Sequence, residues 1–346
     1  MSKKVLLTGD RPTGPLHLGH YVGSLKKRLD LQRDLETYVM IADAQAITDN
    51  FKDINKVKTN IFEVACDYLA VGIDPAKCSI FIQSQLSELP ELAMYFLNLV
   101  TIQRIGHNPT VKQEVKSRGF KEGVPAGFYL YPMFQVADIT AFQANVVPVG
   151  PDQAPMIELT RDIVRKFNDL YKTDALIMPE AIFPQGEKTL PGLDGQKMSK
   201  SLNNAIYLSD EVDVIVKKVK KMKSDPNRTS IEQGGDPDKA IAFSYLDAFD
   251  PDQKMVLDLK ERYRRGGLQD KIVKERVVEV LCSFLDPIRE KRKIFRNDPS
   301  QVFEILKTGT SAAKEKASNT LHLVKKAMGI DYNFEKSHYT SSASLR

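Results

Sequence analysis

Tryptophan is absent from the sequence, and cysteine and histidine are scarce, with three and five among 346 residues. Cys66, Cys78 and Cys282 are far apart, odd in number and in apolar surroundings, so we expect reduced core residues rather than disulfides or a metal site. No apolar run approaches the roughly 20 residues that span a bilayer, which argues against a membrane protein. The first strand follows directly after residues 1–4, so we expect no signal peptide and a cytoplasmic location.

The overall composition is that of a globular protein. Hydrophobic residues make up 42% of the chain and charged residues 27%, both ordinary proportions for such proteins. The length allows one large domain and a smaller one. The net charge of +5 permits an RNA partner but does not require one.

A glycine-containing segment near the N-terminus is the first candidate for a ligand site. The apolar strand 5–7 runs into residues 8–21, TGDRPTGPLHLGHY, and a helix follows from near His17 to about Leu35. Parallel α/β folds build phosphate sites from this order of strand, glycine turn and helix N-terminus. The spacing matches neither GxGxxG nor a P-loop. His17 and His20 could donate hydrogen bonds to charge that builds up on phosphate oxygens, and two ordinary surface histidines are the alternative.

A lysine- and serine-rich loop late in the chain is the second candidate. Residues 197–201, KMSKS, follow the loop 191–195, PGLDG. Two lysines and two serines on a glycine-bounded loop suit a mobile clamp on a polyphosphate. Taken alone, the segment could equally be a solvated lysine loop.

Alternating strand and helix patterns predict a doubly wound, Rossmann-like parallel sheet. Besides the first strand, buried strands are predicted at 38–42, 79–82 and 146–150, and a helix at 54–71 ends at Gly72. Strand–helix alternation at this spacing favours parallel strands. Ligands bind such sheets at the carboxyl ends of the strands, where the sequence has Thr8, Asp43, Gln83 and Pro151-Asp152-Gln153.

Polar side chains on one face of an apolar helix mark another part of the site. Tyr131, Gln135 and Asp138 stand at i, i+4 and i+7 in the helix predicted at 128–142. Buried polar groups need partners. The face is therefore either a structural network or the wall of a pocket for a small ligand with a polar group.

The middle of the chain carries three further predictions. Residues 88–105 show the pattern of one helix, and residues 108–127 are polar, which is typical of a surface excursion beside the site. A helix is expected after Gln153, running to about Phe167.

Beyond Ser201 the strand patterns stop, which predicts a smaller all-α domain. We expect a catalytic α/β domain over 1–205, a helical domain over 206–330 whose last helix could pack back on the first, and a polar, poorly ordered tail over 331–346. Helices of the second domain are expected at 209–223, 239–249, 253–263, 271–294 and 300–328.

Together, HLGH after the first strand and KMSKS late in the chain resemble the paired signatures of class I aminoacyl-tRNA synthetases. Residues 1–330 are similar to the bacterial tryptophanyl-tRNA synthetases, most closely in TGDRPTGPLHLGHYVGSL, VPVGPDQAPMIELTRDIVRKFN and LPGLDGQKMSKSLNNAIYL. The resemblance implies that L-tryptophan reacts with ATP, with Mg²⁺, to give tryptophanyl-adenylate and pyrophosphate, and that tryptophan passes to the 3′ end of tRNA(Trp). It further implies a homodimer and an anticodon-binding helical domain.

The resemblance also implies roles for individual residues, with catalysis by positioning and charge stabilisation and with no covalent intermediate or metal-ligating side chains. The catalytic set would be His17, His20, Lys197 and Lys200. The ATP-binding set would be Arg11, Pro12, Thr13, Gly19, His20, Gly150, Pro151, Asp152, Leu190, Lys197, Met198, Ser199, Lys200 and Ser201. The tryptophan-binding set would be Tyr131 and Gln153 at the ammonium group, Asp138 at the indole N–H, Leu7, Ile139, Val147 and Val149 around the ring, and Gln135.

The chain departs from common members of that family. Many of them have a Thr-containing, Asn-ended motif in place of HLGH and a glutamine in place of Arg11, so this chain resembles a second subgroup. The roles of Gln45 and Gln135 in the pocket stay open.

Two alternatives remain. A tyrosyl-tRNA synthetase is the nearer one, since the pattern of Tyr131, Gln135 and Asp138 resembles that family's pocket as well. Tyrosyl enzymes place a tyrosine two residues before the glycine of the first turn, where this chain has Leu7, and we expect no further RNA-binding module after the helical domain. The other alternative is an RNA-binding or regulatory paralogue without synthetase activity, and the intact HLGH, GPDQ and KMSKS motifs argue against it.

Overall fold

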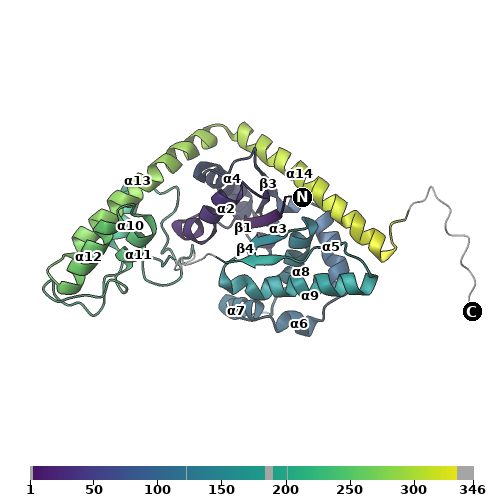
Figure 1. The fold of residues 1–346 in the computed structure, drawn as a ribbon, viewed down its shortest axis with the longest axis horizontal. Helices are drawn as coiled ribbons and strands as arrows, with labels where there is room; N and C mark the ends of the chain where they lie inside the picture. Colours follow the sequence, from purple (N-terminus) through teal and green to yellow (C-terminus); the bar gives the residue numbers. More distant parts are fainter. Residues whose placement is uncertain (1–2, 122, 184–189, 201, 333–346) are drawn as a thin grey trace, which may run out of the picture.

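A five-stranded parallel sheet forms the centre of the molecule (Figure 1). The structure, a computed structural model, describes residues 3–121, 123–183, 190–200 and 202–332. The strands are β1 (Val5–Asp10), β2 (Glu36–Ile41), β3 (Cys78–Ile82), β4 (Val146–Pro148) and β5 (Glu180–Ile182), in the order β3-β2-β1-β4-β5. The order reverses beside β1, which pairs with β2 on one side and β4 on the other. In parallel sheets this reversal opens a crevice at the carboxyl ends of the two strands.

Helices cover both faces of the sheet, as the alternation of strands and helices predicts. Along β2, Val39 and Ile41 pack in one buried cluster with Val64 of α4 (Ile54–Val71). Tyr38 and Met40 point to the other face, where a second cluster contains residues of α5 (Glu88–Leu97), α8 (Ala126–Ala141) and α9 (Ala154–Tyr171). Successive side chains of a strand alternate between faces, so a strand buried on both faces is apolar throughout. The prediction of a doubly wound sheet is confirmed.

Shorter helices surround the carboxyl ends of the strands. The first helical segment begins with α1 (Leu18–His20), continues as a π-helical turn over Tyr21–Leu25 and ends with α2 (Lys26–Leu31), four residues before the predicted end. The segments α3 (Asp43–Asn50) and β5 were not predicted. The remaining short helices are α6 (Ile102–Gly106), α7 (Pro109–Arg118) and the 3₁₀ turns Gln83–Gln85 and Pro151–Gln153.

For the middle of the chain, the structure corrects one prediction and adds a helix to another. The helix expected at 88–105 is two helices, α5 and α6, because the chain turns after Leu97 and the Thr101 side chain caps α6 by accepting from the Arg104 amide. The excursion at 108–127 contains α7, whose N-cap is Asn108 and whose first residue is proline. Cap residues of these types favour helix starts at those positions.

The second half of the chain is helical, with α10 (Val212–Lys220), α11 (Ile241–Phe249), α12 (Gln253–Arg265), α13 (Asp270–Asn297) and α14 (Pro299–Met328). The first three and the start of α13 lie to one side of the sheet, and α14 runs back across it (Figure 1). Gly309 of α14 lies so close to β3 that a Cβ there would be 2.1 Å from the Ile80 carbonyl oxygen. Thr310 Oγ1 accepts a hydrogen bond from the amide of Ile82 at 3.3 Å. The long last helix thus covers the edge strand.

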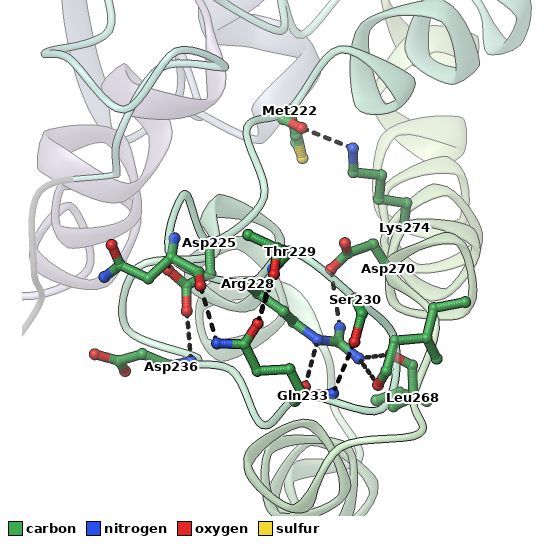
Figure 2. Close-up of polar contacts among 12 residues, drawn as sticks. Met222, Asp225, Arg228, Thr229, Ser230, Gln233, Asp236, Leu268, Asp270 and Lys274 are labelled. Carbon is green, nitrogen blue, oxygen red and sulfur yellow. Dashed lines mark hydrogen bonds and ion pairs between the residues drawn. The ribbon is translucent and has the colours of Figure 1, made fainter.

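A buried arginine organises the segment between α10 and α11 (Figure 2). Arg228 donates to the carbonyl oxygens of Ile231, Gln233 and Leu268 at 2.6–2.9 Å, and its guanidinium lies 4.4 Å from the ring centre of Tyr263. The segment is therefore fastened to the turn between α12 and α13. It also reaches the loop 191–195 that precedes KMSKS, because the Lys223 main-chain amide donates to the Leu193 carbonyl at 3.0 Å.

Candidate active site

A cavity of about 940 Å³ opens at the carboxyl ends of β1, β2 and β4. Its walls come from the glycine loop after β1, the HLGH segment, α7, α8, the turn after β4 and the KMSKS loop. This is the position at which a doubly wound sheet binds its ligands. The cavity brings together segments that are far apart in the sequence.

The histidine rings of HLGH lie against each other at a tilt of 45°, and burial favours their neutral forms. His17 is the N-cap of α1 rather than a residue within it, and its ring centre lies 3.8 Å from that of His20. Burial lowers the pKa of His17 to about 2 and that of His20 to about 4, and the positive charge of Lys200 lowers both further. The His17 amide donates to His20 Nδ1 at 3.1 Å, so the proton of the neutral His20 ring is on Nε2. Each imidazole can therefore donate one hydrogen bond.

Gly19 allows the two motifs to touch. Its amide points at the sulfur of Met198 with an N···S distance of 3.3 Å. A Cβ at Gly19 would lie 3.0 Å from the His17 ring and 3.2 Å from that sulfur. A side chain here would push the KMSKS loop away from HLGH, which explains the glycine between the histidines.

Backbone pairing holds the same two segments together. The Leu18 amide donates to the Ile206 carbonyl at 2.9 Å, and the Leu208 amide donates to the Leu16 carbonyl at 3.0 Å. The residues that follow KMSKS therefore form a short antiparallel pairing with the residues that start HLGH. The two motifs are parts of one structural unit.

The two lysines of KMSKS occupy different places. Lys200 lines the cavity, and its Nζ donates to the Gly14 carbonyl at 2.5 Å. Burial lowers the pKa of Lys200 to about 8, although Asp10 opposes the shift. Lys197 is mostly exposed, and its Nζ lies 3.7 Å from Asp152 of the GPDQ turn. Lys200 closes one side of the cavity, whereas Lys197 reaches across its rim.

A buried carboxylate stands at the apolar end of the cavity. Asp138 is 2% exposed, and both of its oxygens accept from Gln83 Nε2, at 2.9 and 2.8 Å. Burial raises the pKa of Asp138 to about 7, and the bond from Gln83 opposes the shift. Gln83 is itself held in place, because its Oε1 accepts a hydrogen bond from the main-chain amide of Gln45 at 3.0 Å. Asp138 is thus an acceptor held ready for a further donor.

Two other polar atoms on the same helix are buried without hydrogen-bond partners among the described residues. These are the Tyr131 hydroxyl and Gln135 Oε1, and both residues line the cavity. Burial and the nearby carboxylate of Glu114 raise the pKa of Tyr131, so its hydroxyl stays protonated. Buried polar atoms without partners are costly. Their position on the wall indicates that a ligand supplies the partners, which favours the pocket over the structural network.

Comparison with known proteins identifies the family. Residues 2–286 match the model of the class I tRNA synthetases for tryptophan and tyrosine (W and Y). The chain belongs to this family. The synthetase is 51% identical over 336 residues to the tryptophan–tRNA ligase of Clostridium longisporum, covering 96% of this chain and 98% of that protein. It is 52% identical over 339 residues to the tryptophan–tRNA ligase of Streptococcus pneumoniae serotype 4, covering 96% and 99%.

Solved structures show the same fold. The tryptophanyl-tRNA synthetase of Campylobacter jejuni, complexed with ADP and tryptophan, superposes on this synthetase with a TM-score of 0.83 at 29% identity, covering 94% of this chain and 99% of that one. The enzyme from Mycoplasma pneumoniae superposes with a TM-score of 0.79 at 26% identity, covering 94% and 98%. The Rossmann-like fold expected from the motifs is therefore confirmed.

Most of the residues predicted for the synthetase site line the cavity. For tryptophan these are Leu7, Tyr131, Gln135, Asp138, Ile139, Val147, Val149 and Gln153, and for ATP they are Arg11, Thr13, Gly19, His20, Gly150, Asp152, Met198, Ser199 and Lys200. His17 lines it too. Their roles stay predictions.

Four predicted residues of the synthetase lie outside the cavity lining. Pro12 is buried and Pro151 is exposed. Leu190 is packed in the core at 3% exposure, and its expected contact with adenine stays a prediction. Lys197 stands at the rim. A fifth, Ser201, lies outside the described residues, as do residues 333–346 of the predicted tail.

Sequence reasoning missed a buried ion pair beneath the glycine loop of the synthetase. Arg28 Nη1 donates to Asp10 Oδ2 at 2.6 Å, and the Tyr68 hydroxyl donates to the same oxygen at 2.8 Å. Burial opposes ionisation of Asp10, yet Arg28 holds its pKa well below the usual range. The pair fixes the end of β1 against α2 and α4. Asp10 lies inside the motif itself, but Arg28 has no sequence signal that separates it from a surface arginine.

Helix α7 contributes residues to the synthetase site that the excursion prediction did not specify. Arg118 and Arg11 both form ion pairs with the carboxylate of Asp49, the latter at 3.3 Å. Asp49 is almost fully buried, with 3% of its side chain exposed. Arg118, Arg11 and Lys56 line the cavity on the same side as Lys200, whose pKa is lowered by burial and by the charges of Arg11 and Lys56. This end of the cavity is therefore cationic.

The described residues give no sign of a resident metal or of a membrane segment in the synthetase. They contain no group of three or more histidine, cysteine, aspartate or glutamate side chains that could hold a metal ion. None of the helices described is both long and apolar enough to cross a bilayer. Cys66, Cys78 and Cys282 are free, and the first two are buried.

Proposed function

We propose that this chain is a tryptophan–tRNA ligase, which activates L-tryptophan with ATP to tryptophanyl-adenylate and pyrophosphate and then transfers tryptophan to the 3′ end of tRNA(Trp). The observation that carries the proposal is the polarity of the cavity. One end is cationic, with Arg11, Arg118 and Lys200, and the other is lined by apolar side chains around the buried carboxylate of Asp138. An ATP polyphosphate suits the first end, and an indole ring with its one N–H donor suits the second.

On the ATP side, the glycine loop and HLGH form the floor. Thr13, Gly19 and His20 would face the phosphates, with the ribose against Gly150 and Asp152. The neutral rings of His17 and His20 supply N–H donors without adding charge to the free site. Lys200 would exchange its bond to the Gly14 carbonyl for the β- and γ-phosphates, and Lys197 would turn inward from the rim.

On the tryptophan side, Asp138 would accept the indole N–H. Leu7, Val147 and Val149 offer apolar surface around the ring, and Leu7 gives no hydroxyl to meet a phenol. Tyr131 and Gln153 would bind the ammonium group, and the free Gln135 Oε1 is a further acceptor. The relatives named above are tryptophan–tRNA ligases, which supports tryptophan rather than tyrosine.

Activation would proceed by direct displacement at phosphorus. An oxygen of the tryptophan carboxylate attacks the α-phosphorus of ATP, the new C–O–P linkage forms, and the bond to the β-phosphate oxygen breaks. Pyrophosphate leaves with the electron pair of that bond, so no proton has to move. The protein orients the two substrates and stabilises the charge that builds up on pyrophosphate, which is the work proposed for Lys200, Lys197 and the histidines.

Mg²⁺ would enter with the polyphosphate and neutralise part of its charge. The carboxylates at the cationic end are already engaged, Asp10 by Arg28 and Asp49 by two arginines. Since Mg²⁺ is commonly held by one or two carboxylates, substrate phosphates and water, the residues present fit an ion carried by ATP rather than one held by the protein alone.

The remaining proposals concern partners and location. We assign residues 1–205 to catalysis and residues 206–330 to anticodon binding, for which the lysine-rich face of α10 offers positive charge. We also propose a homodimer in the cytoplasm.

ATP–pyrophosphate exchange tests the proposed function. Exchange should depend on L-tryptophan and should be weak with L-tyrosine. Stronger exchange with tyrosine would favour the tyrosyl alternative, and no exchange with any amino acid would favour a paralogue without synthetase activity.

A further inference from the structure

Asn204 lies buried beside the KMSKS loop, three residues after its last serine. The residue is 3% exposed. The backbone around it is packed so closely that a Cβ at Gly192 would lie 2.3 Å from Asn204 Nδ2. Asparagine is mostly found on protein surfaces, so a buried one needs hydrogen bonds.

The side-chain amide meets the loop with both of its functional groups. Asn204 Oδ1 accepts from the Ser199 amide at 2.8 Å. Its Nδ2 donates to Asp194 Oδ1 at 2.8 Å and to the Lys197 carbonyl at 3.3 Å. The main-chain carbonyl of Asn204 adds a fourth bond, from the Leu193 amide at 2.9 Å. One side chain thus fixes the loop on both sides of Lys197.

The same residue begins the segment that pairs with HLGH. The next residues, 205–208, include the two that bond to Leu16 and Leu18. Asn204 therefore connects the turn that carries the lysines to residues 205–208, which are held by main-chain hydrogen bonds to Leu16 and Leu18. A change in the turn at Asn204 would move both lysines relative to the cavity, while the cavity itself would stay in place.

We propose that Asn204 is a positioning residue for adenylate formation: its amide holds the turn 194–199 so that Lys197 and Lys200 are presented to the departing pyrophosphate. The role rests on the proposed function. It needs a donor and an acceptor on one short side chain, because the Ser199 amide is a donor and the carboxylate of Asp194 is an acceptor. The bond from Asn204 also lowers the pKa of Asp194, which keeps that acceptor ionised.

The test compares Asn204→Asp with Asn203→Asp, a matched change one residue earlier at an exposed position. Aspartate at 204 can still accept from Ser199, but it places a carboxylate against that of Asp194. We expect the single-turnover rate of tryptophanyl-adenylate formation to fall by on the order of 10²-fold, as for a reacting group misplaced by about 1 Å. Because the chain contains no tryptophan, a change in tryptophan fluorescence on binding comes from the substrate alone, and the affinity that this change measures should stay the same. The control variant should match wild type in both.

An exchanged pair provides the rescue. In the double variant Asp194→Asn/Asn204→Asp, the side chain at 194 becomes the donor and the side chain at 204 the acceptor, so the hydrogen bond between them forms again in the opposite direction. The adenylation rate should therefore be at least about tenfold higher than in Asn204→Asp, as expected when two neighbouring side chains interact directly. Hydrogen exchange gives a readout that does not depend on catalysis: the Ser199 amide should exchange faster in Asn204→Ala, while Leu18 keeps its protection.

Different failures are distinguishable. A normal rate for Asn204→Asp, or a loss explained wholly by fewer active sites in a titration, overturns the positioning role, as does a double variant no better than the single one. A wild-type chain that exchanges no pyrophosphate with tryptophan refutes the proposed function itself, and the role of Asn204 with it.

Discussion

Replacing Asp138 by asparagine should weaken tryptophan activation and at the same time remove a loss of stability that the free protein undergoes as the pH rises to neutral and alkaline values. The change keeps the shape of the side chain and removes its charge. In the protein, both carboxylate oxygens already accept from Gln83 Nε2, and the proposed indole N–H would be a second donor. Asparagine offers one acceptor oxygen for these two donors, and its own NH₂ group then faces that of Gln83.

The expected loss of activity follows from one unmade hydrogen bond. A buried donor without its partner costs about 1–3 kcal/mol, which corresponds to a roughly 5- to 150-fold fall in kcat/KM for tryptophan. The benzothienyl analogue of tryptophan, in which sulfur replaces the indole N–H, isolates this bond. Wild type should prefer tryptophan to this analogue, and Asp138→Asn should lose most of the preference. Pyrophosphate exchange with both substrates is the assay.

The stability effect has the opposite sign. Burial raises the pKa of Asp138 from 3.8 to about 7, so the folded chain binds this proton more tightly than the unfolded chain does. The stability that the protonated carboxyl contributes is complete below about pH 4 and is lost as the pH rises through about 7. Between pH 5 and pH 8 the loss is about 3 kcal/mol, and asparagine does not incur it.

Thermal unfolding of the free protein checks the sign. From pH 5 to pH 8, the melting temperature of Asp138→Asn should rise relative to that of wild type by about 5 °C. Asp174→Asn, at an exposed position, is the control and should show no such trend. If the benzothienyl analogue is discriminated equally by wild type and variant, or if the two melting curves shift together with pH, the reasoning about Asp138 is wrong.

Three further predictions concern other parts of the molecule. Lys200→Ala should slow adenylate formation by on the order of 10²-fold in single-turnover kinetics, with little change in tryptophan affinity. In the wild-type protein, kcat/KM for ATP should fall as the pH rises through about 8, where Lys200 loses its charge. Lys200→Arg should move that fall to higher pH. Arg292 of α13 pairs at 2.6 Å with the fully buried carboxylate of Asp67 on α4, so Arg292→Leu should cost about 3–5 kcal/mol in chemical denaturation. Arg296→Leu, at an exposed position of α13, should cost at most about 1 kcal/mol. Gly309→Ala should lower the melting temperature, because its Cβ would lie 2.1 Å from a backbone oxygen of β3 and overpacking costs about 1–3 kcal/mol. Gly127 has open space around it, so Gly127→Ala is the control and should leave the melting temperature unchanged.

The sequence determined the parts of this protein that depend on local pattern. Apolar strands followed by helical spacing specified four of the five strands and the doubly wound sheet, because a strand covered on both faces has to be apolar throughout. Local chemistry also specified where helices end. Gly72 stops α4 in the left-handed region at φ 105°, as expected of a glycine after a helix. Motif order alone was enough to predict the family.

The sequence also contains helix-cap residues that the apolar periodicity does not reveal. Asn108 followed by proline is a helix start, and Thr101 is a cap, so α6 and α7 could have been predicted from the chemistry of helix caps rather than from apolar periodicity. β5, with three residues of which none is fully buried, has too short a pattern to stand out. Strands of this length form because a neighbour is already in place.

Only the tertiary structure decided which distant residues meet. Arg28 is a buried partner of Asp10, and Asn204 bonds to three residues of the loop 194–199, yet each looks like an ordinary surface residue in the sequence. The structure also separates the two lysines, with Lys200 against the glycine loop and Lys197 at the rim, and it packs Leu190 in the core. Such outcomes depend on packing between segments far apart in the chain, such as those of Gly14 and Lys200, which are 186 positions apart. The conformational preference of a residue depends on its neighbours in the sequence, so it cannot show that a distant segment will bury that residue.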